Sequence, residues 1–189
     1  PPADPGLRIN WNPLTETWRI LRFTSRNRTV FLSVLGISWF WFYGALLVTQ
    51  FPNLAKNILN AGEGYVTVLL VVFSVGVGLG SLLCERLSGH KVELGLVPFG
   101  SIGLTICGLD LGFSAPLGGW RLLADLALLG VFGGFYTVPL YALVQARAHP
   151  GHRSRVIAGL NILNSLFMVV ASVMAMLVLG SRGFTLPEL

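Results

Sequence analysis

The sequence predicts an all-α, polytopic membrane protein with five transmembrane helices, and three observations support this prediction. Of its 189 residues, 53% are hydrophobic and only 11% are charged, whereas a soluble domain carries about 25% charged residues. The apolar residues form five continuous stretches, each close to the roughly 20 helical residues that cross a bilayer. They show no alternation, which argues against barrel strands. We expect spans at about 30–50, 65–83, 92–113, 120–144 and 156–179.

The chain divides near residue 30. Residues 1–29 are expected to form a cytoplasmic linker, in which Asn12 and Pro13 predict the start of a short amphipathic helix. Such a helix would hold Trp18 at headgroup depth and arginines against anionic lipid, although an ordinary linker helix fits the pattern equally well. Residues 30–189 are expected to form a partial transmembrane domain. Its five spans indicate part of a six-helix half of a longer protein, and the chain begins without methionine.

The basic residues are distributed unevenly between the two sides of the predicted bundle. Ten of the 13 Lys and Arg residues lie before the first span, between spans two and three, or between spans four and five. The positive-inside rule therefore predicts that the N-terminus of this segment is cytoplasmic. The excess of basic residues indicates the topology of the chain and contact with anionic lipid, and nucleic acid is not an expected partner.

The first two spans carry aromatic and small residues. Span one has five consecutive aromatic residues, Trp39–Tyr43, which favour either a bulky wall beside an acyl-chain-sized cavity or ordinary packing. Gln50 is a late polar residue of this span, and Pro52 is expected to end it. In span two, Gly76 and Gly80 share one helix face and predict a close approach by another helix.

Spans four and five hold the polar residues of most interest. Asp125 lies inside span four, one turn after Arg121. It either forms an ion pair with that arginine or faces the path of a substrate. Asn161 and Asn164 in span five either line such a path or hydrogen-bond neighbouring helices. The candidate path residues are therefore Trp39, Trp41, Gln50, Asp125, Asn161 and Asn164.

No residue pattern predicts an enzyme, a metal site or a cofactor. His90, His149 and His152 lie in basic loops without a set of metal-ligating partners. No nucleophile and base can be paired. Cys84 and Cys107 lie in or beside apolar spans and are expected to be small buried residues.

The loop after span two resembles a signature of the major facilitator superfamily. In that family, an acidic and a basic residue follow a small residue and precede glycine and further basic residues. Glu85, Arg86, Gly89 and Lys91 match this pattern, except that the pair follows Gly80 one position later than the family pattern expects. The resemblance implies part of a twelve-helix transporter. An acidic residue at a helix end can pair with a basic residue of a neighbouring helix and stabilise one state, although a solvated charged loop that obeys the positive-inside rule fits the same residues.

Longer strings resemble the bacterial lysophospholipid transporters of this superfamily, especially a form fused to an acyltransferase and acyl-carrier-protein synthetase. They are Asn12–Arg19, Gly36–Trp41, Gly133–Gln145 and Arg155–Asn164. The resemblance implies helices seven to eleven of the C-terminal half. It also implies a multi-pass protein of the bacterial inner membrane that flips a lysolipid such as lysophosphatidylethanolamine inward for re-acylation. Membrane lipid, the N-terminal half of the same transporter and the fused acyltransferase would be its partners.

Two other functions fit the same composition. The segment could be a membrane anchor for a fused acyltransferase that transports nothing, or part of an exporter of another small amphipathic solute. The second alternative stays open because a fold does not determine its substrate.

Overall fold

The computed structural model describes residues 12–89, 91–148, 151 and 153–182. Within these ranges the protein is helical and contains no strand. Five helices are long and apolar enough to cross a membrane, which confirms the predicted fold class. The elements are α1 (Pro13–Thr24), α2 (Arg28–Asn53), the π-helical turn η1 (Leu54–Ile58), α3 (Glu63–Leu87), α4 (Leu96–Ser114), α5 (Gly119–Arg147) and α6 (Arg153–Arg182).

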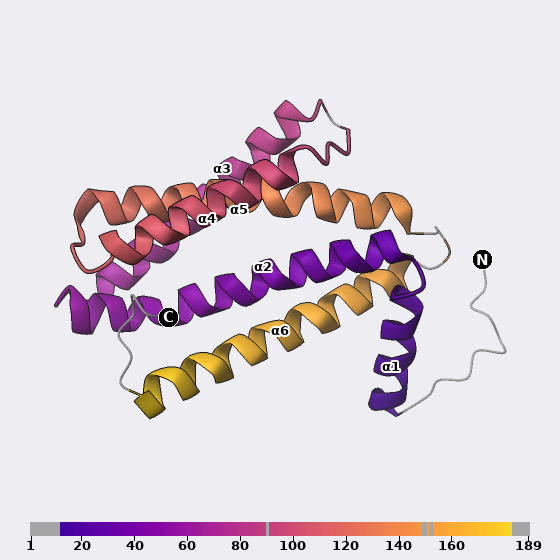
Figure 1. Ribbon diagram of the computed structural model, residues 1–189, viewed down its shortest axis with the longest axis horizontal. Coiled ribbons are helices and arrows are strands. Elements are labelled where there is room, and N and C mark those ends of the chain that lie inside the picture. The colour runs from indigo at the N-terminus through magenta and orange to yellow at the C-terminus, as the bar shows by residue number, and fades with distance from the viewer. Residues whose placement is uncertain (1–11, 90, 149–150, 152, 183–189) are drawn as a thin grey trace.

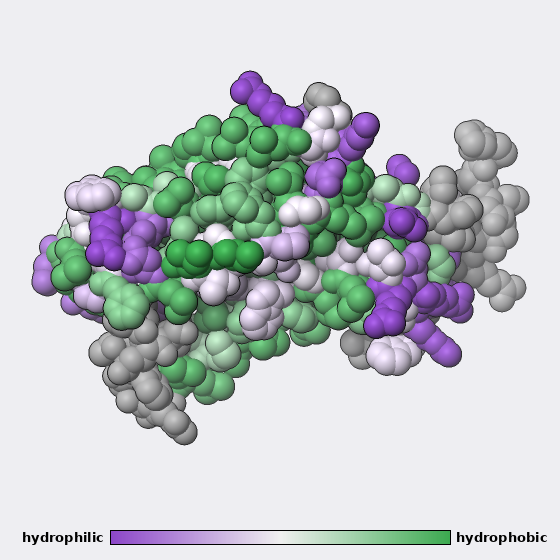
Figure 2. All heavy atoms as spheres, turned by 45° about the horizontal axis from the view of Figure 1, so that its top comes forward, coloured by the Kyte–Doolittle hydropathy of each residue, from purple (hydrophilic) through white to green (hydrophobic). Residues whose placement is uncertain are grey.

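The helices form two groups that meet along α5 (Figure 1). Helix α5 packs against both α3 and α4, and it also contacts α2, which in turn packs against α6. Helix α1 packs against α6 and runs across the end of the bundle. Figure 2 shows apolar side chains over the middle of one face and hydrophilic side chains towards its ends, as expected for a bundle solvated by lipid.

Facing glycines explain why α3 and α5 lie so close together. A Cβ atom added to Gly130 would lie 2.6 Å from the carbonyl oxygen of Phe73, and one added to Gly134 would lie 2.5 Å from the carbonyl carbon of Gly80. On α3, a Cβ at Gly76 would overlap the backbone of α5 in the same way. Only glycine allows this backbone contact, so the predicted close approach of another helix to span two is confirmed, and the structure identifies that helix as α5.

The bundle has one apolar core near each end. One core joins the starts of α2 and α6 to the end of α5 and includes Val34, Val144 and Leu160. The other joins the end of α2 to α3, α4 and the start of α5 and includes Phe51 and Leu126. The hydrogen bond between Ser38 of α2 and Asn164 of α6 lies between these two cores.

The predicted end of the first span is wrong. Pro52 lies inside α2, and the chain continues through η1 to Ile58. The wider turn still forms backbone hydrogen bonds, since the amide of Leu59 donates to the carbonyl of Leu54 over 3.0 Å. Burial of Phe51 and Leu54 in the second core holds this extra turn in place, so packing overrides the local effect of proline.

The short first helix forms where the sequence predicts it. The amide of Thr15 donates to the side-chain oxygen of Asn12 over 3.3 Å, which is the expected N-terminal cap. Residues 1–11 of the predicted linker lie outside the described residues. Both cysteines are buried and free, as predicted.

Candidate functional site

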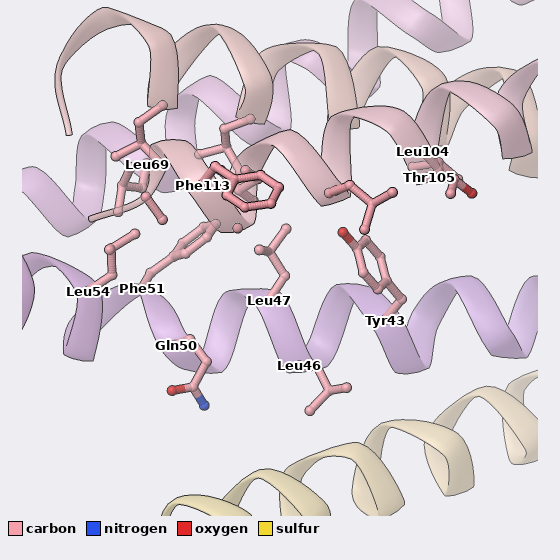
Figure 3. Close-up of a pocket in the computed structure, with 17 residues that line it drawn as sticks. Tyr43, Leu46, Leu47, Gln50, Phe51, Leu54, Leu69, Leu104, Thr105 and Phe113 are labelled. Atoms are coloured by element: carbon pink, nitrogen blue, oxygen red, sulfur yellow. The ribbon is translucent and has the colours of Figure 1, made fainter. Parts of the chain in front are cut away.

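A cavity of about 600 Å³ lies between α2 and α4 (Figure 3). Its walls are mostly apolar, and the polar side chains among them belong to Tyr43, Gln50 and Thr105. The volume falls within the range of about 300–1,000 Å³ that small-molecule sites occupy. The apolar lining comprises Leu46, Leu47, Phe51, Leu54, Leu69, Leu104, Leu109, Leu111, Phe113, Ala115, Leu122 and Leu126, with Gly108 and Gly112 on α4.

The cavity exists because α4 presents glycines where α2 presents large side chains. Tyr43, Leu47 and Phe51 point from α2 towards α4. Tyr43 reaches furthest, because a Cβ atom added to Gly108 would lie 2.7 Å from its hydroxyl oxygen. A Cβ added to Gly112, in contrast, would meet no atom within 4 Å. Gly112 therefore borders open space, and Tyr43 with Gly108 marks a narrow point.

Gln50 is the one predicted path residue that lines the cavity. Its amide points away from α4, on the side of α2 that faces α6 (Figure 3). The site thus has an apolar interior and a polar group at its edge, which is the arrangement that an amphipathic ligand requires.

The buried Asp125 belongs to a separate polar cluster. Its carboxylate, with only 7% of the residue exposed, accepts a hydrogen bond of 2.5 Å from the hydroxyl of Ser114. Arg121 forms its ion pair with Asp110 of α4. The alternative that pairs Arg121 with Asp125 is therefore wrong: Arg121 lies at the start of α5, from where its side chain reaches back to the preceding helix.

A second polar cluster connects α2, α5 and α6 near the middle of the bundle. The hydroxyl of Ser38 donates to the side-chain oxygen of Asn164 over 2.8 Å. The indole nitrogen of Trp41 donates to the hydroxyl of Tyr141 over 3.0 Å, and the amide of Asn164 donates weakly to the same hydroxyl over 3.5 Å. Asn164 and Trp41 thus hold three helices together.

The other two predicted path residues do not join these clusters. Trp39 is 59% exposed and stacks on Phe42, with ring centroids 5.2 Å apart. Asn161 is exposed, although it lies only one turn before the buried Asn164. The structure therefore distributes the six predicted residues over several places and does not bring them to one site.

The predicted signature loop lies at the end of α3. Glu85 and Arg86 occupy its last turn and are exposed, and Lys91 is exposed beyond it. Gly89 has a φ of 55°, in the left-handed region that favours glycine after a helix. This positive φ explains why a glycine occupies position 89. His90, His149 and His152 lie outside the described residues.

Sequence reasoning missed the residues that define the cavity and complete the polar clusters. In the sequence, Tyr43 stands out only as the last member of an aromatic run. The spacing of Asp110 and Ser114, one turn apart on α4, was an available signal that this helix faces Asp125 with polar groups. Within the described ranges, no group of three or more His, Cys, Asp or Glu residues could hold a metal ion.

Comparison with known proteins gives a consistent result. Residues 1–172 match the family described as Major Facilitator Superfamily. The chain is 31% identical over 153 residues to the lysophospholipid transporter LplT of Klebsiella pneumoniae, covering 78% of this chain and 37% of that protein. It is 32% identical, again over 153 residues, to LplT of Cronobacter sakazakii, covering 77% of this chain and 36% of that protein. The chain therefore spans a little over a third of the length of these relatives. No solved structure matches it significantly.

Proposed function

Because the chain belongs to the major facilitator superfamily, we propose that it forms part of the C-terminal half of a lysophospholipid transporter that works by alternating access. Its five apolar helices and its family make it a multi-pass membrane segment of a transporter. The relatives named as lysophospholipid transporters support an amphipathic lipid as the substrate.

The observation that carries this proposal is the apolar cavity between α2 and α4. A lysophospholipid has one acyl chain, and a cavity of about 600 Å³ with apolar walls is suited to hold one chain. In our proposal the acyl chain of the lipid lies along Leu47 and Phe51 of α2 and passes next to Gly112 of α4. The amide of Gln50, at the cavity edge, hydrogen-bonds the polar headgroup.

The moving parts follow from the packing. Glycines bring the backbones of α3 and α5 into direct contact at Gly76, Gly80 and Gly130, and we propose that these helices slide along this contact during alternating access. Glu85 and Arg86, exposed at the end of α3, would pair with another part of the full transporter in one state only. The anchor hypothesis predicts no such movement.

The proposed topology rests on the charge distribution, and the inward direction is part of the proposal. The arginine-rich end of the bundle is proposed to be cytoplasmic, in the bacterial inner membrane. Inward flipping would then deliver the lysolipid to the leaflet where an acyltransferase, fused or separate, restores the second chain.

The test is uptake of a fluorescent lysophosphatidylethanolamine by liposomes that contain the full-length protein. A diacyl phosphatidylethanolamine with the same fluorophore is the matched control, because it has the same headgroup and two chains. We expect the monoacyl lipid to cross at least tenfold faster. Equal rates for the two lipids, or no difference from protein-free liposomes, would refute the proposal.

A further inference from the structure

Two arginine-bearing segments that lie far apart in the sequence converge at one end of the bundle. The first core brings the start of α2 together with the end of α5 and the start of α6. Helix α1 is held there too, since a Cβ atom added to Gly159 of α6 would lie 2.5 Å from the hydroxyl of Thr24. Seven exposed arginines surround this junction: Arg19, Arg22, Arg26, Arg28, Arg147, Arg153 and Arg155. We call them the arginine surface.

The positive charge of six of these seven arginines is not neutralised by the described carboxylates. Apart from Arg19, none of the seven arginines forms an ion pair with a carboxylate in the part of the chain that the structure describes. Two cations at the opposite end differ: Lys56 lies 3.9 Å from Glu63, and Arg121 pairs with Asp110.

The neighbouring loop between α3 and α4 shows that the excess of positive charge is confined to the arginine surface. It carries two basic residues, Arg86 and Lys91, and also two acidic residues, Glu85 and Glu93. This loop lies at the same end of the bundle but is balanced in charge. Like charges brought together raise the free energy of a surface unless an anion binds there, so the arginine surface is expected to attract one.

Helix α1 identifies the kind of anion. It runs across the end of the bundle, crosswise to α2 and α6 (Figure 1), and therefore parallel to the plane of a membrane that those helices cross. Ile20 and Thr24 face α6 at Gly159. Trp18, 69% exposed, and Arg22 lie on the outer side. An exposed tryptophan beside arginines on a helix in the membrane plane is typical of contact with lipid headgroups.

We infer that the arginine surface is a binding site for anionic phospholipid headgroups, in addition to any transported lipid. The guanidinium groups bind the headgroup phosphates, for which the planar fork of arginine is well suited. Convergence of the two segments lets one anionic lipid contact arginines from both, which fixes α1 against the membrane. The structure thereby favours the interfacial helix over the ordinary linker helix.

The experiment measures lipid binding to the full-length protein in mild detergent by native mass spectrometry. The protein is titrated with dioleoylphosphatidylglycerol or, separately, with dioleoylphosphatidylcholine, which is zwitterionic. Arg26→Gln combined with Arg155→Gln removes one charge from each segment. Arg86→Gln combined with Lys91→Gln removes two charges at the same end of the bundle, outside the arginine surface.

We expect wild-type protein to prefer the anionic lipid and the Arg26/Arg155 variant to bind it about 30-fold more weakly, from about tenfold per 1.4 kcal/mol and about 1 kcal/mol per basic residue. The Arg86/Lys91 variant should stay within threefold of wild type. If the Arg26/Arg155 variant fails to insert, Arg26→Lys with Arg155→Lys keeps the charge and should retain the preference for the anionic lipid.

Three results would overturn the inference: equal binding of the two lipids, equal loss in the Arg86/Lys91 variant, or displacement of the lipid by soluble glycerol phosphate at equal concentration. The last result would identify a site for a soluble phosphate. Because no transport is measured, each of these outcomes leaves the proposed lysophospholipid transport standing, and failure of transport leaves this binding site standing.

Discussion

Filling the cavity from α4 should block the substrate without disturbing the fold. Gly112 lines the cavity, and a Cβ atom added there meets nothing within 4 Å. In Gly112→Phe the ring therefore enters the space that we assign to the acyl chain. If it displaces about four methylene groups at about 0.8 kcal/mol each, binding weakens by about 3 kcal/mol, or roughly 150-fold. Loss of a glycine from a helix favours folding by up to about 1 kcal/mol.

The matched control is Gly78→Phe. Gly78 is an exposed glycine of α3, also with no atom within 4 Å of an added Cβ, and it lies outside the cavity. Both variants would be placed in the full-length protein, and binding of a fluorescent lysophosphatidylethanolamine would be measured by titration. We expect Gly78→Phe to bind within threefold of wild type. Wild-type affinity in a folded Gly112→Phe protein would refute the assignment of the cavity.

Three further outcomes follow from the same contacts. Gly80→Leu should lower the melting temperature strongly, because its side chain would overlap the backbone of α5 at Val131 and overpacking typically costs about 1–3 kcal/mol; Gly78→Leu is the control, and equal melting temperatures would contradict this packing. Asn164→Leu should cost about 1 kcal/mol by removing the acceptor of Ser38, and a double-mutant cycle with Ser38→Ala should show a coupling energy that is clearly different from zero. Tyr43→Ala should weaken lysolipid binding at least fivefold, whereas Trp39→Ala, outside the cavity, should leave binding within twofold of wild type. A larger loss of binding in Trp39→Ala than in Tyr43→Ala would indicate that the acyl chain lies against the tryptophans instead.

Hydrophobic length and glycine spacing made the architecture predictable. Each apolar stretch of about 20 residues became a helix, because lipid leaves the backbone no other partner for its hydrogen bonds. The spacing of Gly76 and Gly80 correctly indicated a close helix contact. The predicted end of the first span is wrong because it considers only the effect of Pro52 on its own helix. The burial of Phe51 and Leu54 in the second core depends on other helices and is not visible in the local sequence.

The cavity could not be predicted because it depends on two helices that are distant in sequence. Tyr43 and Gly108 meet only after α2 and α4 are placed. A run of aromatic residues drew attention to Trp39 and Trp41, yet a helix turns consecutive residues by about 100°. Members of such a run therefore face different neighbours, and only Tyr43 of these three faces the cavity.

The partners of polar residues were also beyond sequence reasoning. Spacing along one helix favoured Arg121 with Asp125, but the structure pairs Arg121 with Asp110 across the turn between α4 and α5. The same limit applies to Asn161 and Asn164. They are three residues apart, yet one is exposed and the other is held by Ser38 of α2.

The most direct test of the account is to crosslink the substrate in place. A lysophosphatidylethanolamine with a photoreactive group at the end of its acyl chain would be bound to the full-length protein, irradiated and mapped by peptide mass spectrometry. The account predicts adducts on Tyr43–Leu54 of α2 and η1 and on Leu104–Phe113 of α4, and it predicts that excess unlabelled lysolipid suppresses them. Adducts confined to the outer faces of α3 and α6, or adducts that unlabelled lysolipid does not reduce, would contradict it.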